Sequence, residues 1–286
     1  MSIARARARA RTRPVSLAAA DTPPGPPRRR VAAAVPADKE FMTTLAKGLA
    51  VLEAFDRERA SMTLSEAAAA TDLSRAAARR ILRTLAQLGY VDQDGRSFSL
   101  SPNILRLGFA YVAAQHWIER ALPLMRTLSE QTRESCSASI LQGNEIVYVA
   151  RVQTTRIMSG AVSVGSRLTA LHTAMGRVQL GFLDDSELWR RLSTARIEPL
   201  TPYTILDLQA LFDRIKADHE QGFSLVDEEL ERGLRSMAVP IVDRQGQAVA
   251  ALNLSTHASR TTRNEMRDRF LPALRSLAAQ IGLFVG

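Results

Sequence analysis

The most constraining feature of the chain is a basic segment between Ser74 and Gly89. Ser74 is suited to cap the start of a helix, and Gly89 to end it. At about 100° per residue, one side of this helix is apolar and the other basic. The apolar side carries Ala77, Ala78, Ile81, Leu85 and Leu88, and the basic side carries Arg75, Arg79, Arg80 and Arg83. We predict that the first side packs against the protein and the second contacts phosphate.

A shorter helix precedes this segment. Thr63 and Glu66 have the spacing of a capping box at its start. The predicted turn is Thr71-Asp72-Leu73, where Asp72 stands at a position often occupied by glycine, and aspartate tolerates the left-handed conformation. A still earlier helix, with a stripe of Leu45, Leu49, Leu52 and Phe55, should complete a three-helix core.

A hairpin follows Gly89. Asp94-Gly95 is a two-residue hairpin signal, and Phe98 and Leu100 alternate toward the core, with Arg96 at the tip. Four arginines on a helix are by themselves typical of a solvated surface, but this order of elements is that of a winged helix-turn-helix. We expect double-stranded DNA to be contacted by Ser74, Arg75, Arg79, Arg80, Arg83 and Arg96.

Charge is concentrated at the N-terminus. The formal net charge is +9, of which residues 1–40 hold nine cationic and three acidic side chains, or +6. This Ala-, Arg- and Pro-rich tail lacks the apolar content needed to order itself, so 1–40 is predicted to be disordered. It has no apolar core of a signal peptide, whereas its composition allows an organelle transit peptide. Two further explanations stay open: a start codon chosen upstream of the true one, or a basic arm that raises nonspecific DNA affinity.

Several classes of protein are disfavoured by composition. No run approaches eighteen apolar residues, so no membrane span is predicted. The single cysteine, Cys136, excludes an internal disulfide and fits a reducing cytoplasm. The four histidines lack metal-ligand spacing, so we expect neither a metal nor a cofactor.

The segment 101–118 is predicted to be a connector helix. Ser101 caps it and Pro102 occupies its first turn. Leu105, Phe109 and Val112 form an apolar stripe that serves either pairing with a second copy or core packing within one chain.

The remainder, 119–286, is predicted to be α+β, with an antiparallel sheet covered by helices. Strands are expected at 136–140, 146–149, 237–242 and 248–254, and helices at 173–182, 207–221 and 262–284. The segment has no nucleophile elbow, zincin motif or phosphate-binding glycine loop, so a sensor is favoured over an enzyme.

Several motifs resemble the IclR family of bacterial transcriptional regulators. They are, in chain order, the segment 45–55, the winged module, and the segment 233–240 within the second domain. Glu134-Ser-Cys136, Val147-Tyr-Val-Ala-Arg151, Arg156-Ile-Met158 and the run 225–230 are similar to the group that controls β-ketoadipate pathway genes, the PcaR, PcaU and PobR type. The resemblance covers roughly residues 41–286.

The resemblance implies a 41–100 winged DNA-binding domain and a 119–286 GAF-like domain for effector binding and oligomerisation. It also implies a homodimer or a dimer of dimers on operator DNA, cytoplasmic and associated with the nucleoid, and a possible contact with RNA polymerase. The effector would be a small organic acid such as protocatechuate, 4-hydroxybenzoate or β-ketoadipate. Activation is the commoner behaviour of the group. A rival from another class is an architectural, nonspecific DNA-binding protein whose C-terminal domain only dimerises.

The effector residues expected from the resemblance lie in three segments. Exposed N–H groups at a helix start suit a carboxylate, and Ser236, Asn253 and Ser255 offer neutral hydrogen bonds. Each position also has a plain structural interpretation, as a cap, a core residue or an exposed strand position. The predicted set is Leu168, His172, Thr173, Ala174, Met175, Gly176, Ser236, Asn253 and Ser255.

One position departs from the group. His172-Thr-Ala174 stands where the group commonly has Cys-Thr-Ser, so His172 either alters the effector preference or is a packed surface histidine. For the acidic run Asp227, Glu228 and Glu229 we expect solvation or ion pairing, because carboxylates repel an anionic effector.

Overall fold

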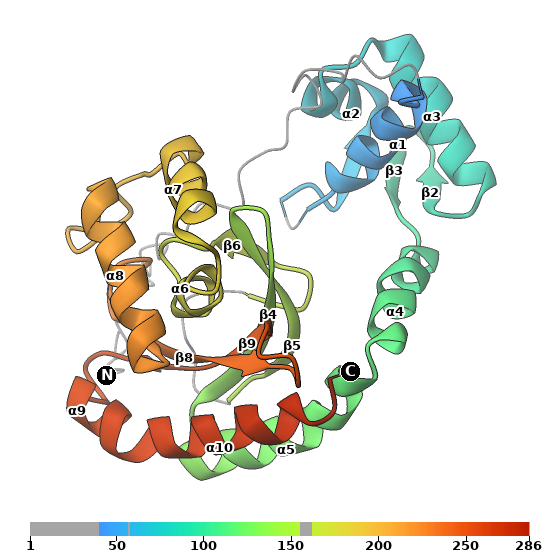
Figure 1. Ribbon diagram of the computed structural model, residues 1–286. Helices are drawn as coiled ribbons and strands as arrows, with labels where there is room; N and C mark the ends of the chain where they lie inside the picture. Colours follow the sequence, from blue (N-terminus) through green and yellow to red (C-terminus); the bar gives the residue numbers. More distant parts are fainter. Residues whose placement is uncertain (1–39, 57, 155–161, 286) are drawn as a thin grey trace, which may run out of the picture.

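The computed structural model describes residues 40–56, 58–154 and 162–285. The predicted disordered tail, apart from Glu40, and the motif Arg156-Ile-Met158 lie outside the described residues. A small N-terminal unit is joined through helix α4 to a larger unit built on a sheet (Figure 1). The predicted α+β class, with a winged helix-turn-helix followed by an antiparallel sheet and helices, is confirmed.

The N-terminal unit contains three helices and a three-stranded sheet in the order β1-β3-β2. Its elements are α1 (Thr43–Glu53), β1 (Ser61–Thr63), α2 (Leu64–Thr71), α3 (Arg75–Gln87), β2 (Val91–Asp94) and β3 (Ser97–Leu100). Strand β1 was not predicted; it pairs with β3, with Met62 opposite Phe98. Strand β3 thus pairs with β1 on one side and with β2 on the other, and the β2–β3 hairpin is the wing.

Local capping explains these boundaries. The Glu66 carboxylate accepts a hydrogen bond from the Thr63 N–H (2.7 Å), and the Thr63 hydroxyl accepts one from the Glu66 N–H (3.3 Å). Asp72 ends α2 in the left-handed region at φ 55°. Ser74 Oγ accepts from the Ala77 N–H (3.2 Å), and Gly89 follows α3 at φ 77°. The predicted capping box, turn and cap are confirmed.

Two details of the predicted N-terminal core are wrong. Leu45 and Leu49 are 58% and 49% exposed, because the contact of this segment with the core is made by Val51 near the end of α1 and by Phe55 after it. Leu88, expected on the apolar side of α3, is 62% exposed and lies just beyond the helix, which ends at Gln87. Leu82, absent from the predicted apolar face, is fully buried.

The connector begins with a 3-10 turn, η1 (Pro102–Ile104), and continues as α4 (Leu105–Ala114). Ser101 Oγ accepts from the Asn103 N–H, as expected of a cap. Gln115, at φ −104° and ψ 74°, separates α4 from α5 (His116–Thr132), whose Trp117 already lies in the core of the larger unit. The predicted connector helix 101–118 is therefore interrupted at Gln115. The domain boundaries at residues 100 and 118 stay predictions.

The larger unit is built on a six-stranded antiparallel sheet with the order β6-β5-β4-β9-β8-β7. The strands are β4 (Ser135–Gln142), β5 (Glu145–Val152), β6 (Arg167–Thr169), β7 (Ser224–Asp227), β8 (Leu234–Val242) and β9 (Ala248–His257). All four predicted strands are present within β4, β5, β8 and β9, while the three- and four-residue strands β6 and β7 were not foreseen.

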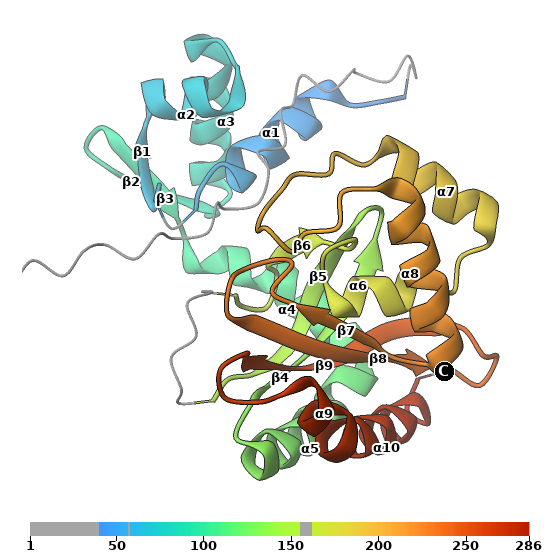
Figure 2. The same ribbon diagram turned by 90° about the vertical axis from the view of Figure 1, so that its left-hand side faces the viewer.

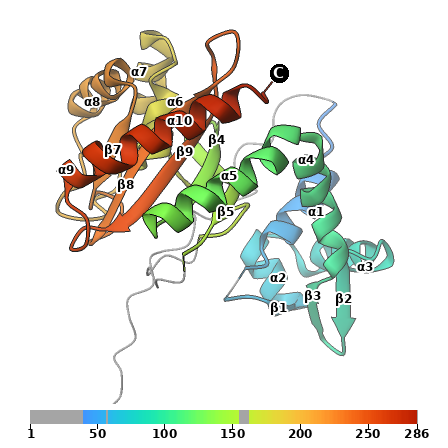
Figure 3. The same ribbon diagram turned by 90° about the horizontal axis from the view of Figure 1, so that it is seen from below.

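Helices cover both faces of this sheet (Figure 2). One face carries α5 and α10 (Leu271–Gly282), which lie side by side (Figure 3). The other carries α6 (Ala174–Leu180), α7 (Asp185–Thr194) and α8 (Leu208–Gln221). Short turns α9 (Arg263–Glu265) and η2 (Met266–Phe270), the latter π-helical, lead into α10. We refer below to the second face as the α6 face.

Strand alternation divides the side chains between two cores. Cys136 and Ala138 of β4, with Leu252 and Leu254 of β9, point toward α5 and α10. Ala251 of β9 and Ala238 of β8 lie instead in the core of the α6 face. Polar residues that alternate with the first set therefore face α6, which places Asn253 and Ser255 on that side.

Candidate functional sites

The predicted DNA-contacting residues are all exposed and lie on α3 and on the wing hairpin. Ser74, Arg75, Arg79, Arg80 and Arg83 of α3 and Arg96 of the wing are all exposed. No salt bridge joins any of these arginines to a carboxylate within the described part of the chain. Ala78, Ile81, Leu82 and Leu85 anchor the opposite side of α3 in the core. The arrangement leaves five unpaired cations on a rigid helix and hairpin, which suits a phosphate backbone.

The predicted effector segment 172–176 lies at the start of α6. Thr173 Oγ1 accepts from the Gly176 N–H (3.1 Å), so Thr173 is the cap of this helix. Ala174 and Met175 are 1% exposed and belong to the core of the α6 face, while Leu168 lies half-buried in β6. Their part in effector binding stays a prediction.

His172 is not a surface residue. It is 2% exposed, and its Nδ1 has no hydrogen-bond partner among the described residues. Burial, together with the positive charge of Arg177, lowers the pKa of His172 to about 4, against a smaller opposing effect of Glu229. The imidazole is thus neutral at pH 7 and presents an unsatisfied nitrogen inside the α6 face.

Three predicted effector residues form one hydrogen-bonded network. Asn253 Nδ2 donates to Ser236 Oγ (2.9 Å) and to Ser255 Oγ (3.0 Å), and the Ser255 hydroxyl donates to Ser236 Oγ (3.2 Å). Asn253 is 3% exposed, so it is not an exposed strand position, and its Oδ1 accepts from the Ser137 N–H (3.1 Å). We call Ser236, Asn253 and Ser255 the neutral network.

Sequence reasoning missed two residues beside the neutral network. Ser137 of β4 lies directly opposite Asn253 of β9, and Arg151 of β5 lies directly opposite Ser137. Arg151 Nη1 donates to Ser137 Oγ (3.4 Å), and its Nε is buried with no hydrogen-bond partner in the described residues. The motif ending in Arg151 was noted for its resemblance alone, because nothing in its spacing shows where the side chain points.

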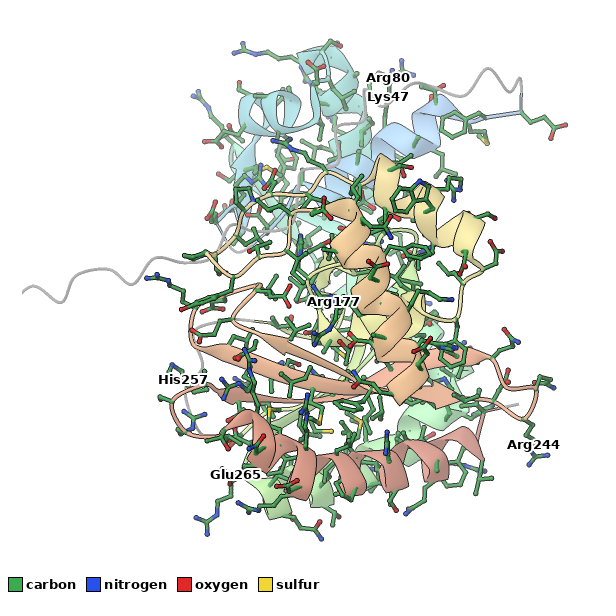
Figure 4. All side chains as sticks on the ribbon, turned by 60° about the vertical axis from the view of Figure 1, so that its left-hand side comes forward. Lys47, Arg80, Arg177, Arg244, His257 and Glu265 are labelled. Atoms are coloured by element: carbon green, nitrogen blue, oxygen red, sulfur yellow. The ribbon has the colours of Figure 1, made fainter. Side chains whose placement is uncertain are left out.

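Two residues of the acidic run at the end of β7, Asp227 and Glu229, are ion-paired, as expected, while the Glu228 carboxylate accepts a hydrogen bond from the Gly233 N–H (2.8 Å). Glu229 accepts two hydrogen bonds from the fully buried Arg177 guanidinium, at 2.8 and 2.5 Å. Arg177 lies between the sheet and the helices of the α6 face (Figure 4). Burial raises the pKa of Asp227, but hydrogen bonds from Arg235 and Arg263 outweigh it and hold that pKa below its usual range. These pairs fix the loop between β7 and β8 over the sheet.

Other features of the described residues bear on function. A hollow of about 430 Å³ is lined by Glu40, Phe41, Met42, Leu45, Ala46 and Leu49, at α1 and well removed from the neutral network. Burial raises the pKa of Cys136 to about 12, so its thiol is inert. No His, Cys, Asp and Glu side chains of residues 40–56, 58–154 and 162–285 gather in a group able to hold a metal. Among the helices described, none has the length and apolar character to cross a membrane.

Comparison with known families matches both units. Residues 44–95 match the IclR helix-turn-helix domain, and residues 109–283 match the C-terminal domain of bacterial transcriptional regulator IclR. The first match contains α3 and strand β2 of the wing and ends before Arg96 and β3, and the second contains the neutral network, Arg151 and the Arg177–Glu229 pair.

Individual relatives agree with this assignment. The Pca regulon regulatory protein of Pseudomonas putida is 43% identical over 263 residues, which cover 92% of this chain and 90% of that protein. The p-hydroxybenzoate hydroxylase transcriptional activator of Acinetobacter baylyi is 34% identical over 248 residues, 85% of this chain and 92% of that protein.

A solved structure extends the comparison to the larger unit. The inducer-binding domain of the PobR transcription factor from Acinetobacter, a double mutant in complex with 3-hydroxybenzoic acid, gives a TM-score of 0.56 at 31% identity. The match covers 59% of this chain and 98% of that one. The resemblance noted from the sequence motifs is confirmed: the chain belongs to the IclR family of bacterial transcriptional regulators.

Proposed function

We propose that the protein binds operator DNA through α3 and the wing, and that its larger unit senses an aromatic carboxylic acid on the α6 face. The observation that carries the sensing role is the neutral network, in which Asn253 is buried and the two serines are half-buried, with Arg151 two strands away across Ser137. Two relatives support the chemistry, since one is named for p-hydroxybenzoate hydroxylase and the other was solved with 3-hydroxybenzoic acid. The effector class is therefore a hydroxylated benzoic acid.

The DNA-binding role assigns the contact surface to the unpaired arginines. In the proposed complex Arg75, Arg79, Arg80 and Arg83 contact phosphate or base edges, Ser74 contacts phosphate, and Arg96 touches the backbone or the minor groove. Residues 41–100 act as the DNA-binding domain and 119–286 as the effector and oligomerisation domain. A homodimer, or a dimer of dimers, places two recognition helices on a palindromic operator.

Acid binding would alter the spacing of the two recognition helices through α4, because α4 alone joins the winged unit to α5. A ligand shifts such an equilibrium only by its differential affinity for the two arrangements. We assign the protein an activating role at its operator in the cytoplasm, exerted through contact with RNA polymerase. It does not transform the acid it binds.

Titration calorimetry of the full-length protein tests the sensing role. The probes are 4-hydroxybenzoate, 3-hydroxybenzoate, protocatechuate and β-ketoadipate, with unsubstituted cyclohexane carboxylate as the nonaromatic control. We expect saturable binding of at least one aromatic acid, recovery of that acid unchanged after prolonged incubation, and weaker binding of the control. Absence of binding by every aromatic acid would overturn the sensing role.

A variant tests the DNA-binding role. Arg79→Ala should weaken operator binding by about 1–3 kcal/mol if Arg79 reads a base, or lower the salt slope by about one if it contacts phosphate. The control is Arg190→Ala, an exposed arginine of α7. Unchanged affinity of Arg79→Ala at physiological salt would remove α3 from the interface.

Deletion of residues 1–40 should leave specific operator binding intact. Loss of all DNA binding would favour the rival function, an architectural, nonspecific DNA-binding protein.

A further inference from the structure

Arg151 differs from the other arginines of similar burial. Each of the other buried or half-buried arginines in the described residues forms a salt bridge with a carboxylate. These arginines are Arg59, Arg167, Arg177, Arg191, Arg214 and Arg235. No such bridge is found for Arg151 within the described part of the chain, where its hydrogen bond to Ser137 Oγ, at 3.4 Å, is long. Its counter-charge is therefore not supplied by a described carboxylate.

The cross-strand neighbours that lead from Arg151 to the neutral network are polar but uncharged. Across the sheet, Arg151 stands opposite Ser137, Ser137 opposite Asn253, and Ser255 opposite Ser236 on the next strand. The segment 155–161 that follows β5 contains no acidic residue in its sequence. Burial lowers the pKa of Arg151, with a smaller opposing effect of Tyr148, yet a guanidinium keeps its charge. A cation held this way is costly to bury without an anion.

The geometry of the guanidinium suits a carboxylate. Its Nε and Nη groups form a planar fork that binds the two oxygens of a carboxylate together. In Arg151 the Nε–H is the group without a partner among the described residues, and Nη1 makes the long bond to Ser137. The side-on fork of Nε–H and Nη2–H, the pair that Arg235 uses for Asp227, has no hydrogen-bond partner among the described residues and is open to an incoming carboxylate, while Nη1 keeps its bond to Ser137.

The polar residues from Arg151 to Ser236 form a row across four strands, and the two ends of this row differ in charge. Arg151 lies on β5 and Ser236 on β8, three strand steps apart, or about 14 Å at roughly 4.8 Å per step. The neutral network lies at the far end of this row. Ser236 Oγ accepts from both Asn253 and Ser255, so neither of these two bonds uses its own hydroxyl proton. One end of the row is thus cationic and the other offers a neutral donor.

We propose that Arg151 is the residue that binds the carboxylate of the effector, with the neutral network at the end that receives the ring hydroxyl. This assignment rests on the proposed sensing function and deepens it by giving the acid an orientation. It also implies a preference for the carboxylate over its neutral amide. A residue that only packed β5 against β4 would not impose that preference.

The test compares an acid with its amide in the full-length protein. Calorimetry measures the affinity of 4-hydroxybenzoate and 4-hydroxybenzamide, and of protocatechuate and its amide, for the wild type, Arg151→Gln and Arg151→Lys. A hydrogen bond to a charged group is worth about 1.5–3 kcal/mol. Arg151→Gln should therefore weaken acid binding by about 10–150-fold while changing amide binding less than about threefold. Arg151→Lys, which keeps the charge without the fork, should fall between.

Arg190→Gln is the matched control, because Arg190 is exposed on α7 and paired with Glu187; its acid-to-amide ratio should equal that of the wild type. Loss of affinity for acid and amide alike in both Arg151 variants would mean a structural role and overturn the assignment. An unchanged acid-to-amide ratio in Arg151→Gln would overturn it as well, while leaving the sensing function standing. Failure of the wild type to bind any acid would instead overturn the proposed function itself.

Discussion

At the scale of single residues, His172 shows how burial determines chemistry. The ring is 2% exposed and lies near the Arg177–Glu229 pair, whose cation disfavours a second positive charge. A neutral imidazole at this position avoids that repulsion and keeps Nδ1 uncharged. His172 is therefore an internal residue, placed beside the start of α6.

The pKa of His172 predicts a pH dependence of stability. The imidazole has a pKa near 6.5 when unfolded and about 4 when folded, so the unfolded state takes up the proton first as pH falls. The free energy of unfolding is not reduced by His172 above pH 6.5. As the pH falls from 6.5 to 4, protonation of the unfolded state lowers it by about 3 kcal/mol at most. The variant His172→Asn should lose less free energy of unfolding than the wild type over this pH interval. Urea unfolding followed by tryptophan fluorescence measures the difference.

Both tryptophans, Trp117 and Trp189, lie in helices of the larger unit, so their fluorescence reports on the part that holds His172. His116→Asn, which removes an exposed imidazole at the start of α5, is the comparison variant. It should retain the wild-type difference in unfolding free energy between pH 7 and pH 4. Equal pH dependence of His172→Asn and the wild type would show that the imidazole does not stay neutral on folding.

At the scale of elements, the sequence indicates where helices begin more reliably than what they contact. Thr63, Ser74 and Asp72 act through bonds to residues two to four positions away, so their roles can be inferred locally. Leu45 and Leu49 have the spacing of a buried stripe, yet periodicity does not show whether a neighbouring element reaches that far. Strands of three or four residues, such as β6 and β7, are too short to display alternation.

The sequence predicted one part of the candidate site, the neutral network, and not the charged residues near it. The neutral network followed from the resemblance, and the structure brings its three members together. Arg151 did not follow, because its significance comes from the carboxylate it lacks among the described residues, and pairing is a property of tertiary contacts. The buried Arg177–Glu229 pair joins residues 52 positions apart, a separation over which no sequence pattern operates.

Gly176 is the glycine of α6 where close packing requires the absence of a side chain. A Cβ there would lie 2.1 Å from the Ala170 carbonyl oxygen, a backbone atom that cannot move without displacing the loop before α6. Overpacking costs about 1–3 kcal/mol, so Gly176→Ala should lower the melting temperature of the larger unit by about 2–12 °C in scanning calorimetry.

Gly48 provides the contrasting substitution. It lies within α1, and a Cβ there has no atom within 4 Å, so Gly48→Ala should stabilise that helix by up to about 1 kcal/mol. The two variants make the same chemical change with opposite expected signs. A melting temperature of Gly176→Ala equal to that of the wild type would mean that the loop from Ala170 to Thr173 yields to the added methyl group.

At the scale of the whole molecule, α4 presents an apolar surface that none of the other described residues covers. Leu105 and Phe109, four residues apart and so on one side of the helix, are 70% and 72% exposed, and only Val112 of the predicted stripe packs against the larger core. Core packing within the chain therefore does not explain Leu105 and Phe109. Exposed apolar surfaces of this kind mark association sites, which supports pairing with a second copy in the proposed dimer.

Replacing both residues, Leu105→Gln and Phe109→Gln, should shift the protein toward the 31.4 kDa monomer in sedimentation velocity, because association would no longer remove apolar surface from water. Arg106→Gln, an exposed change on the same helix, should sediment as the wild type does. The double variant should also bind a two-half-site operator no more tightly than a single half-site, since two unlinked winged units gain nothing from the second half-site. A double variant that remains fully dimeric would place the subunit contact elsewhere, with the exposed leucines of α1 as the next surface to alter.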